Sequence, residues 1–316
     1  MNCSGGASSM TATQQRDWQL SLDDGEVLHI RRIWQDAAGA PVLLIHGVMA
    51  NGRIFYTDSG KGLAHYLAAA GFDVFVADLR GRGQSTPKIS AASQHGQTEI
   101  ICRDLPALHG AIRRLKGEVA VHWMAHSWGG VHMSSCLLRH PRLASQVASL
   151  VYFGSKRSIA VRNWRKFLEV DLVWNVLARW LIRMFGYLPA RRIGLGADDE
   201  TEKSHRQSKC WAQRRPWVDS DDGFDYGAAA RHVSLPPTLY FAARNDPCRG
   251  HADDVRRFRD ESGPHLSRLR LLGRAAGHWH DYDHVSLLTH PDAPADHFPL
   301  LLEWLAGRYD KVIENY

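Results

Sequence analysis

The residues with the clearest chemical meaning lie between positions 118 and 130, where an apolar run passes into the sequence Ala-His-Ser-Trp-Gly-Gly. Ser127 stands two residues after a small residue, Ala125, and two before a glycine, Gly129. A serine on a sharp strand-to-helix turn can present its hydroxyl as a nucleophile, and bulky neighbours would clash in such a turn. The pattern predicts Ser127 as a nucleophile; the alternative is a buried serine in a glycine-rich turn.

A second apolar run, residues 42–45, ends in His46 and Gly47. A glycine here lets the backbone approach a bound substrate closely, although the pair is also compatible with an ordinary strand-ending turn. Backbone N–H groups near a serine nucleophile stabilise the negative oxygen that forms when a carbonyl is attacked. We assign these oxyanion donors to Val48 and to Trp128, which begins the predicted helix. We expect the substrate to contact His46, Gly47, Met49 and His126.

Short apolar runs that could position these groups recur along the chain, each close to a segment with helical spacing. Runs of this kind are typical of parallel strands buried on both faces. Residues 17–22 and 26–34 alternate in polarity and predict an antiparallel hairpin before them. We therefore expect an α/β fold with a mostly parallel eight-stranded sheet and helices on both faces. The other six predicted strands are 42–45, 74–77, 119–124, 150–153, 238–242 and 266–272.

Residues 156–233 interrupt this alternation, because they contain five tryptophans but no strand candidate. Within them, residues 170–187 have apolar side chains at helical spacing, with two arginines on the polar face. We expect a helical lid inserted between two parts of the core, residues 1–155 and 234–316. A helix with a broad apolar face and basic residues is also suited to weak contact with an anionic membrane surface.

The composition of the 316-residue chain argues against several classes of protein. The net charge is +6, but the basic residues are dispersed, so we do not expect nucleic-acid binding. The N-terminus lacks a signal-peptide pattern and no run of apolar residues is long enough to span a membrane, which predicts a cytoplasmic protein. Five cysteines without a close pair argue against a disulfide framework or a zinc knuckle. They are Cys3, Cys102, Cys136, Cys210 and Cys248.

The order and spacing of these motifs resemble the α/β-hydrolase superfamily, from residue 42 to the end of the chain. Asp78 to Gly83 is similar to the Asp-x-Arg-Gly-His-Gly turn of many members, with Arg82 in place of the histidine. The C-terminal residues 283–305 resemble a lipase-like subgroup. The other segments that carry the resemblance are HGVMANGRIF (46–55), YLAAAGFDVFVADLRGRGQS (66–85) and AHSWGG (125–130).

The resemblance implies a catalytic triad in the chain order serine, acid, histidine. Asp246 follows the run 238–242 and is the predicted acid, with a turn-capping aspartate as the alternative. In the lipase-like subgroup the catalytic histidine precedes an alanine by nine residues, as His284 precedes Ala293. We therefore favour His284 as the base. His278 and His280 remain alternatives, and Asp281 or Asp283 would replace Asp246 as the acid if it comes from elsewhere.

These residues predict a serine hydrolase that needs no cofactor or metal and cleaves a small-molecule or lipid-like ester. An acyltransferase could use the same triad. The sequence His-x-His-x-x-Asp-His at residues 278–284 is close to a metal-hydrolase motif, although such a motif should lie early in its fold. A non-catalytic binding protein on the same fold is a third alternative.

Overall fold

An eight-stranded sheet forms the centre of the computed structural model, which describes residues 13–213 and 215–316. The strand order is β1-β2-β4-β3-β5-β6-β9-β10. β2 is antiparallel to both of its neighbours, and all other neighbouring strands run parallel. The predicted mostly parallel sheet is therefore confirmed. Its strands are β1 (Gln14–Ser21), β2 (Val27–Trp34), β3 (Pro41–Ile45), β4 (Asp73–Ala77), β5 (Val121–His126), β6 (Val147–Phe153), β9 (Thr238–Ala243) and β10 (Ser267–Leu272).

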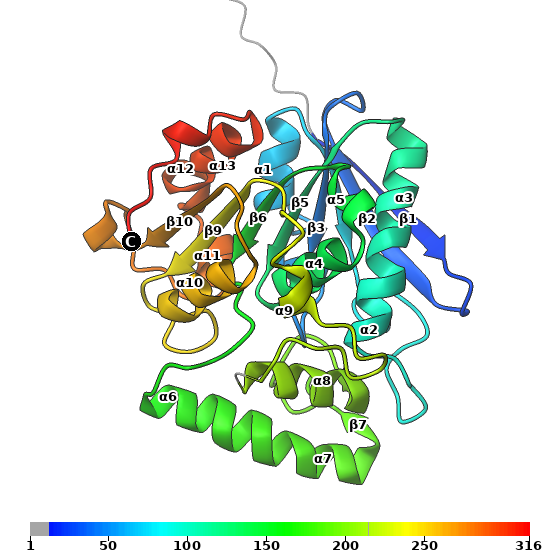
Figure 1. The fold of residues 1–316 in the computed structure, drawn as a ribbon. Coiled ribbons are helices and arrows are strands. Elements are labelled where there is room, and N and C mark those ends of the chain that lie inside the picture. The colour runs from blue at the N-terminus through cyan, green and yellow to red at the C-terminus, as the bar shows by residue number, and fades with distance from the viewer. Residues whose placement is uncertain (1–12, 214) are drawn as a thin grey trace, which may run out of the picture.

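The strands divide their side chains between two apolar cores, one on each face of the sheet. In β3, Leu43 and Ile45 belong to one core and Val42 and Leu44 to the other, because successive side chains of a strand point to opposite faces. Both faces are covered by helices (Figure 1), which explains the continuous apolar runs. One face packs on α3 (Leu105–Lys116), α4 (Trp128–Arg139) and α10 (Ala252–Glu261); the other packs on α1 (Leu63–Ala69), α11 (Ser286–Thr289), α12 (Ala293–Asp296) and α13 (Phe298–Leu305).

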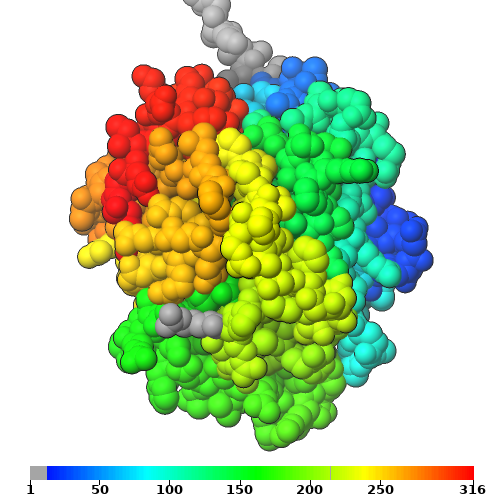
Figure 2. Space-filling model, viewed as in Figure 1, coloured from blue at the N-terminus to red at the C-terminus, as the bar shows by residue number. Residues whose placement is uncertain are grey.

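The segment between β6 and β9 is largely helical and lies at one end of the core (Figure 1 and Figure 2). We call residues 156–233 the insertion. It contains no strand of the main sheet, but the expectation of no strand at all is wrong, because β7 and β8 pair with each other. Each has two residues, too few to leave a periodic pattern. Its elements are α6 (Trp164–Lys166), η3 (Phe167–Leu177, a π-helix), α7 (Ala178–Phe185), β7 (Tyr187–Leu188), β8 (Glu200–Thr201), α8 (Glu202–Ala212) and α9 (Tyr226–Ala229).

Two predictions made for the whole chain can be followed only in part. The four described cysteines, Cys102, Cys136, Cys210 and Cys248, are free, whereas Cys3 lies outside the described residues. None of the helices in the described ranges is long and apolar enough to cross a membrane.

The turn after β4 joins distant parts of the chain through charged side chains. Asp78 accepts hydrogen bonds from the backbone of Gly52 at 2.8 Å and of Gln84 at 2.8 Å, and it pairs with His29. The Arg80 guanidinium forms a buried ion pair with Asp104, which begins α3. Buried charges of this kind are stable only as a pair, because neither ion retains its hydration.

Removing one partner of the Arg80–Asp104 pair should therefore destabilise the fold. Asp104→Ala leaves the Arg80 guanidinium buried with the partly buried Asp24 as its remaining carboxylate. We expect the free energy of unfolding, measured by urea denaturation, to fall by about 3–5 kcal/mol. Asp58→Ala, which breaks the exposed pair with Arg53, is the matched control and should leave the midpoint nearly unchanged. Equal midpoints for the two variants would contradict the structural role of the buried pair.

Candidate active site

Ser127 lies on the sharp turn between β5 and α4 that the sequence predicts. Its backbone has φ 54° and ψ −125°, a conformation that L-residues rarely adopt. The turn is also tightly packed: a Cβ on Gly129 would lie 2.7 Å from the carbonyl oxygens of Ile45 and His46. Position 129 must therefore lack a side chain so that α4 can begin directly beside β3. Strained backbone of this kind is concentrated at functional sites.

Ala125 replaces the glycine that many such turns have two residues before the serine. Its side chain is fully buried, and the position that a Cβ on Gly129 would take is 3.2 Å from the Ala125 Cβ. An alanine therefore fits here because residue 129 is a glycine.

Ser127, His284 and Asp246 lie together at the carboxyl ends of the strands. His284 Nε2 is 2.9 Å from Ser127 Oγ, and His284 Nδ1 is 2.6 Å from Asp246 Oδ2. The three side chains come from the turn after β5, the loop after β9 and the loop after β10. All three residues are buried. This chain of contacts is the arrangement that a serine nucleophile, a general base and an orienting acid require.

The charge of Asp246 is fixed by its surroundings. Burial alone would raise the pKa of this carboxyl, but the adjoining His284 and backbone N–H groups of Arg249 and Gly250 lower it to about 2. The carboxylate is therefore ionised at neutral pH and can only accept hydrogen bonds. The proton between it and His284 accordingly resides on Nδ1, which leaves Nε2 free to accept the hydroxyl proton of Ser127.

The predicted oxyanion donors flank the nucleophile. A Cβ on Gly47 would lie 2.9 Å from Ser127 Cβ and 3.3 Å from Trp128 N. The backbone of the loop after β3 therefore lies directly against the turn that carries the serine. Val48 and Trp128 both line the cavity above Ser127. Trp128 is the first residue of α4, and amides in the first turn of a helix have no acceptor within the helix.

Met49 continues this loop with φ 51°, a second strained backbone conformation beside the nucleophile. Its carbonyl oxygen accepts hydrogen bonds from the amides of Ala197 at 2.9 Å and Asp198 at 3.2 Å. Its own amide lies 3.4 Å from an oxygen of Glu200. The insertion therefore holds the loop that carries Val48.

Of the four residues expected to contact substrate, Gly47, Met49 and His126 line the cavity, and His46 does not. The His46 ring is fully buried behind the loop. Its Nε2 accepts the amide of Leu79 at 3.0 Å and its Nδ1 donates to the carbonyl of Gly47 at 2.8 Å. Burial lowers the pKa of His46, which keeps this ring neutral. The contact of His46 with substrate stays a prediction, and in the structure the ring fixes the orientation of the Gly47 peptide.

His126 holds the loop that carries His284 in place. Its Nε2 is 2.7 Å from the carbonyl oxygen of His284, so Nε2 carries a proton and donates it. Burial and the neighbouring His284 ring lower the pKa of His126 to about 3. The neutral ring therefore positions the backbone of His284 without adding a charge to the site.

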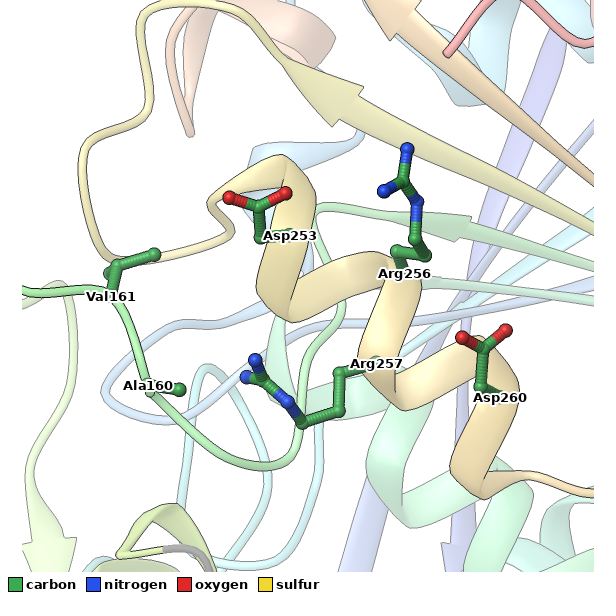
Figure 3. A pocket seen from close by; sticks show the side chains of 6 residues that line it. All are labelled: Ala160, Val161, Asp253, Arg256, Arg257 and Asp260. Atoms are coloured by element: carbon green, nitrogen blue, oxygen red, sulfur yellow. The ribbon is translucent and has the colours of Figure 1, made fainter.

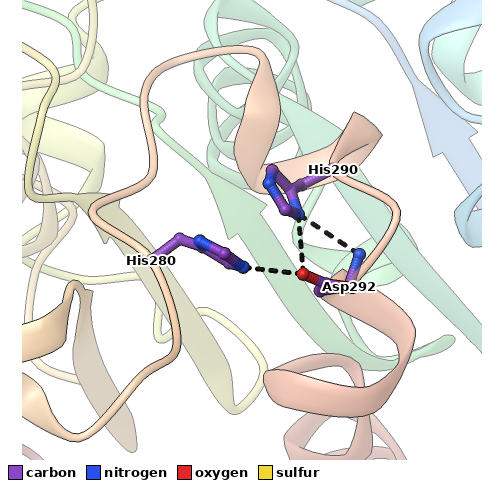
Figure 4. A group of neighbouring side chains, drawn as sticks. All are labelled: His280, His290 and Asp292. Carbon is purple, nitrogen blue, oxygen red and sulfur yellow. Dashed lines mark hydrogen bonds and ion pairs between the residues drawn. The ribbon is translucent and has the colours of Figure 1, made fainter.

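The alternative histidines have other partners. His278 Nδ1 lies 3.0 Å from Asp296. His280 Nε2 lies 2.7 Å from Asp292, beside His290 (Figure 4). His280, His290 and Asp292 are half-buried and, among the described residues, form the one group that could offer three ligand atoms to a metal ion. Asp281 and Asp283 accept backbone hydrogen bonds from Arg274 and Ser286, whereas the His284 ring is bonded to Asp246 and Ser127.

The cavity over Ser127 has a volume of about 600 Å³ and is mostly apolar. The insertion supplies one wall through Val170, Val173, Trp174 and Ala178. A second depression, beside α10, is lined largely by charged residues such as Asp253 and Arg257, and no triad residue lines it (Figure 3). Apolar walls around a few convergent polar groups are typical of small-molecule sites.

Two residues of the cavity region were missed by the sequence analysis. Lys156 is the third residue after β6 and lines the cavity. Glu200 pairs with Arg82 of the turn after β4 and fixes the loop of Met49. The position of Lys156 at the carboxyl end of a strand was a usable signal, whereas the partner of Arg82 is 118 positions away in the chain.

Comparisons with known proteins agree with this architecture. The model of the alpha/beta hydrolase fold family matches residues 40–176. Lipase lipl-3 from Caenorhabditis elegans is 25% identical over 135 residues, which cover 38% of this chain and 33% of that protein. Lipase lipl-5 from the same organism is 27% identical over 135 residues, with 38% and 34% covered. The chain thus spans about a third of the length of the lipases that it matches.

Solved structures extend the likeness to almost the whole chain. Carboxylesterase CesB (YbfK) from Bacillus subtilis has a TM-score of 0.58 and 15% identity, with 95% of this chain and 94% of that chain covered. The esterase RhEst1 from Rhodococcus sp. ECU1013 has a TM-score of 0.56 and 17% identity, with 95% and 99% covered. At this level of identity the likeness shows the fold. Together with the match of the family model over residues 40–176 and the strand order, it shows that this chain has the α/β-hydrolase fold.

Proposed function

We propose that the protein is a serine hydrolase that cleaves carboxylic esters through an acyl-enzyme. The observation that carries the proposal is the continuous contact from Ser127 Oγ through the His284 ring to Asp246. His284 Nε2 takes the hydroxyl proton as Ser127 attacks the ester carbonyl, and the imidazolium then protonates the leaving alcohol. Water, activated by the same nitrogen, hydrolyses the acyl-enzyme and regenerates the serine.

The negative oxygen formed during each attack is stabilised by the amides of Val48 and Trp128. Both residues face the cavity beside Ser127, and the dipole of α4 has its positive end at Trp128. Donors fixed before the reaction require no reorganisation when charge develops, which makes them effective. The rigid loop of Gly47 and Met49 supports this role.

The substrate proposed for this site is a lipophilic ester. Its apolar portion would occupy the cavity walled by Val173, Trp174 and Ala178 of the insertion. In this proposal the insertion acts as a lid, because its side chains form a wall of the cavity that Ser127 also lines. Exclusion of water by such a wall strengthens the electrostatic interactions inside.

Variants of the triad provide the direct test. Ser127→Ala and His284→Ala should each lower kcat for an ester substrate by several orders of magnitude, because members of a triad act as a unit. Asp246→Asn should fold normally and lose most turnover, because the imidazolium loses its orienting carboxylate. His278→Ala is the matched histidine control and should retain most activity. Labelling of Ser127→Ala by a fluorophosphonate probe would reject Ser127 as the nucleophile.

The apolar cavity predicts a dependence on acyl length. Each additional buried methylene contributes roughly 0.8 kcal/mol, or about fourfold in kcat/KM, until the cavity is full. Efficiency measured on para-nitrophenyl esters from two to twelve carbons should therefore rise and then fall. Val173→Trp, which fills part of the cavity, should move the maximum to shorter chains. A maximum at two carbons in the wild type would contradict a lipophilic substrate.

The outer face of the helical stretch from α6 to α7 supports contact with a lipid surface. Large apolar side chains recur there at every fourth residue and are exposed, although ordinary helices turn such residues inward. Arginines such as Arg179 and Arg183 would attract anionic head groups. We propose that this face docks weakly on an anionic membrane. The apolar residues are Leu168, Leu172, Val176, Trp180 and Met184.

Charged substitutions on this face should weaken binding to lipid without affecting the site. Val176→Asp combined with Trp180→Asp should reduce co-sedimentation with vesicles that contain phosphatidylserine, because buried apolar area is lost and like charge is added. Hydrolysis of a short soluble ester should be retained, since neither side chain lines the cavity. Leu115→Asp with Val119→Asp changes two exposed apolar residues elsewhere and is the control. Equal loss of binding in both double variants would contradict docking through the insertion.

A further inference from the structure

Lys156 brings a positive charge to the wall of a mostly apolar cavity. The residue lies shortly after β6, is only 7% exposed, and lines the same cavity as Ser127. Its Nζ lies 5.4 Å from the centre of the Trp128 ring, a cation–π distance. An ammonium group so placed has lost most of its hydration, which is unfavourable unless another group compensates for it.

The protein provides no full compensation for this charge. Among the described residues, no carboxylate forms an ion pair with Lys156. The nearby Asp246 is occupied by His284 and by backbone amides. Burial lowers the pKa of Lys156, although Asp246 and Asp254 partly oppose this effect. The Trp128 ring therefore offers the ammonium an attractive contact, but this ring is neutral.

The other cations at the cavity differ from Lys156 in this respect. Arg249 pairs with Glu169 at 2.6 Å, and Arg53 pairs with Asp58 at 2.5 Å. Each of these guanidinium groups is about half exposed. Lys156 is thus the cavity cation that is both buried and without a carboxylate partner in the described residues.

We propose that Lys156 forms a subsite for a carboxylate carried by the ester substrate at a distance from the scissile bond. A single ammonium suits a monoanion; a phosphate dianion is usually bound by several donors. The inference rests on the proposed ester hydrolysis and narrows its substrate to amphiphilic esters, apolar along the chain and anionic at one point. The carboxylate would replace the hydration that Lys156 loses on folding.

The test compares substrates that differ only in this charge. One series pairs para-nitrophenyl hemi-esters of dicarboxylic acids with para-nitrophenyl esters of monocarboxylic acids of equal length. A second pairs acetates of ω-hydroxy acids with acetates of the matching alkanols. At a favoured length in one series, the anionic-to-neutral ratio of kcat/KM should be on the order of 10- to 100-fold higher in the wild type than in Lys156→Met. Lys156→Arg should keep part of the preference.

Lys61→Met removes the same charge from an exposed position and should leave the ratio unchanged. The same anionic and neutral esters are also titrated calorimetrically into Ser127→Ala. This variant does not cleave them, so the titration measures binding without turnover. Absence of all hydrolysis by the wild type would count against the proposed function, while calorimetry would still decide the subsite. Equal ratios in the wild type and Lys156→Met at every length of both series would overturn the proposal.

Thermal unfolding separates this role from a purely structural one. If Lys156 is unpaired, Lys156→Met removes a desolvated charge and should raise the melting temperature. A structural lysine that neutralises the buried Asp254, one of whose oxygens has no hydrogen-bond partner, would give the opposite result. A lower melting temperature together with an unchanged substrate ratio would therefore assign Lys156 to the fold.

Discussion

The active site depends on one close approach of two backbone segments. The loop after β3 and the turn after β5 meet where Gly47 faces Ser127 and where Gly129 faces the end of β3. Side chains at either glycine would force these segments apart, because the space is already filled by backbone atoms. The contact brings amides of both segments to the nucleophile, and the strained conformations of Met49 and Ser127 are retained because the surrounding packing determines them.

Polar contacts behind the loop after β3 maintain this approach. His46 fixes the Gly47 peptide from behind, and its other ring nitrogen is bound by the turn after β4. Asp78 of that turn holds the amide of Gly52, at the far end of the same loop. Arg82 extends the connection to Glu200 in the insertion. Residues distant in sequence therefore together position the amides of Val48 and Trp128.

Much of this arrangement was predictable from sequence because it depends on local rules. Apolar runs bounded by turns gave the strands, and Ser127 was identifiable because only small neighbours fit its turn. His284 needed the family spacing, since nothing local distinguishes it from His278. The role of His46 was not predictable, because the partner of its Nε2 comes from the turn after β4. The pairing of β7 with β8 and the charge of Lys156 within the cavity depend on tertiary packing alone.

The hydrogen bonds between the Met49 carbonyl and the amides of residues 197 and 198 have a thermodynamic consequence. They join the oxyanion loop to the same insertion that walls the cavity. If the insertion binds the apolar part of the proposed substrate, its ordering and the ordering of the loop that carries Val48 would be coupled equilibria, and the coupling would be reciprocal. A tetrahedral intermediate held by this loop would raise the affinity of the insertion for the apolar part of the substrate. The bound apolar part would stabilise the intermediate by the same factor. In the proposed reaction, part of the binding energy of the apolar part of the substrate would in this way be available at the reacting carbon.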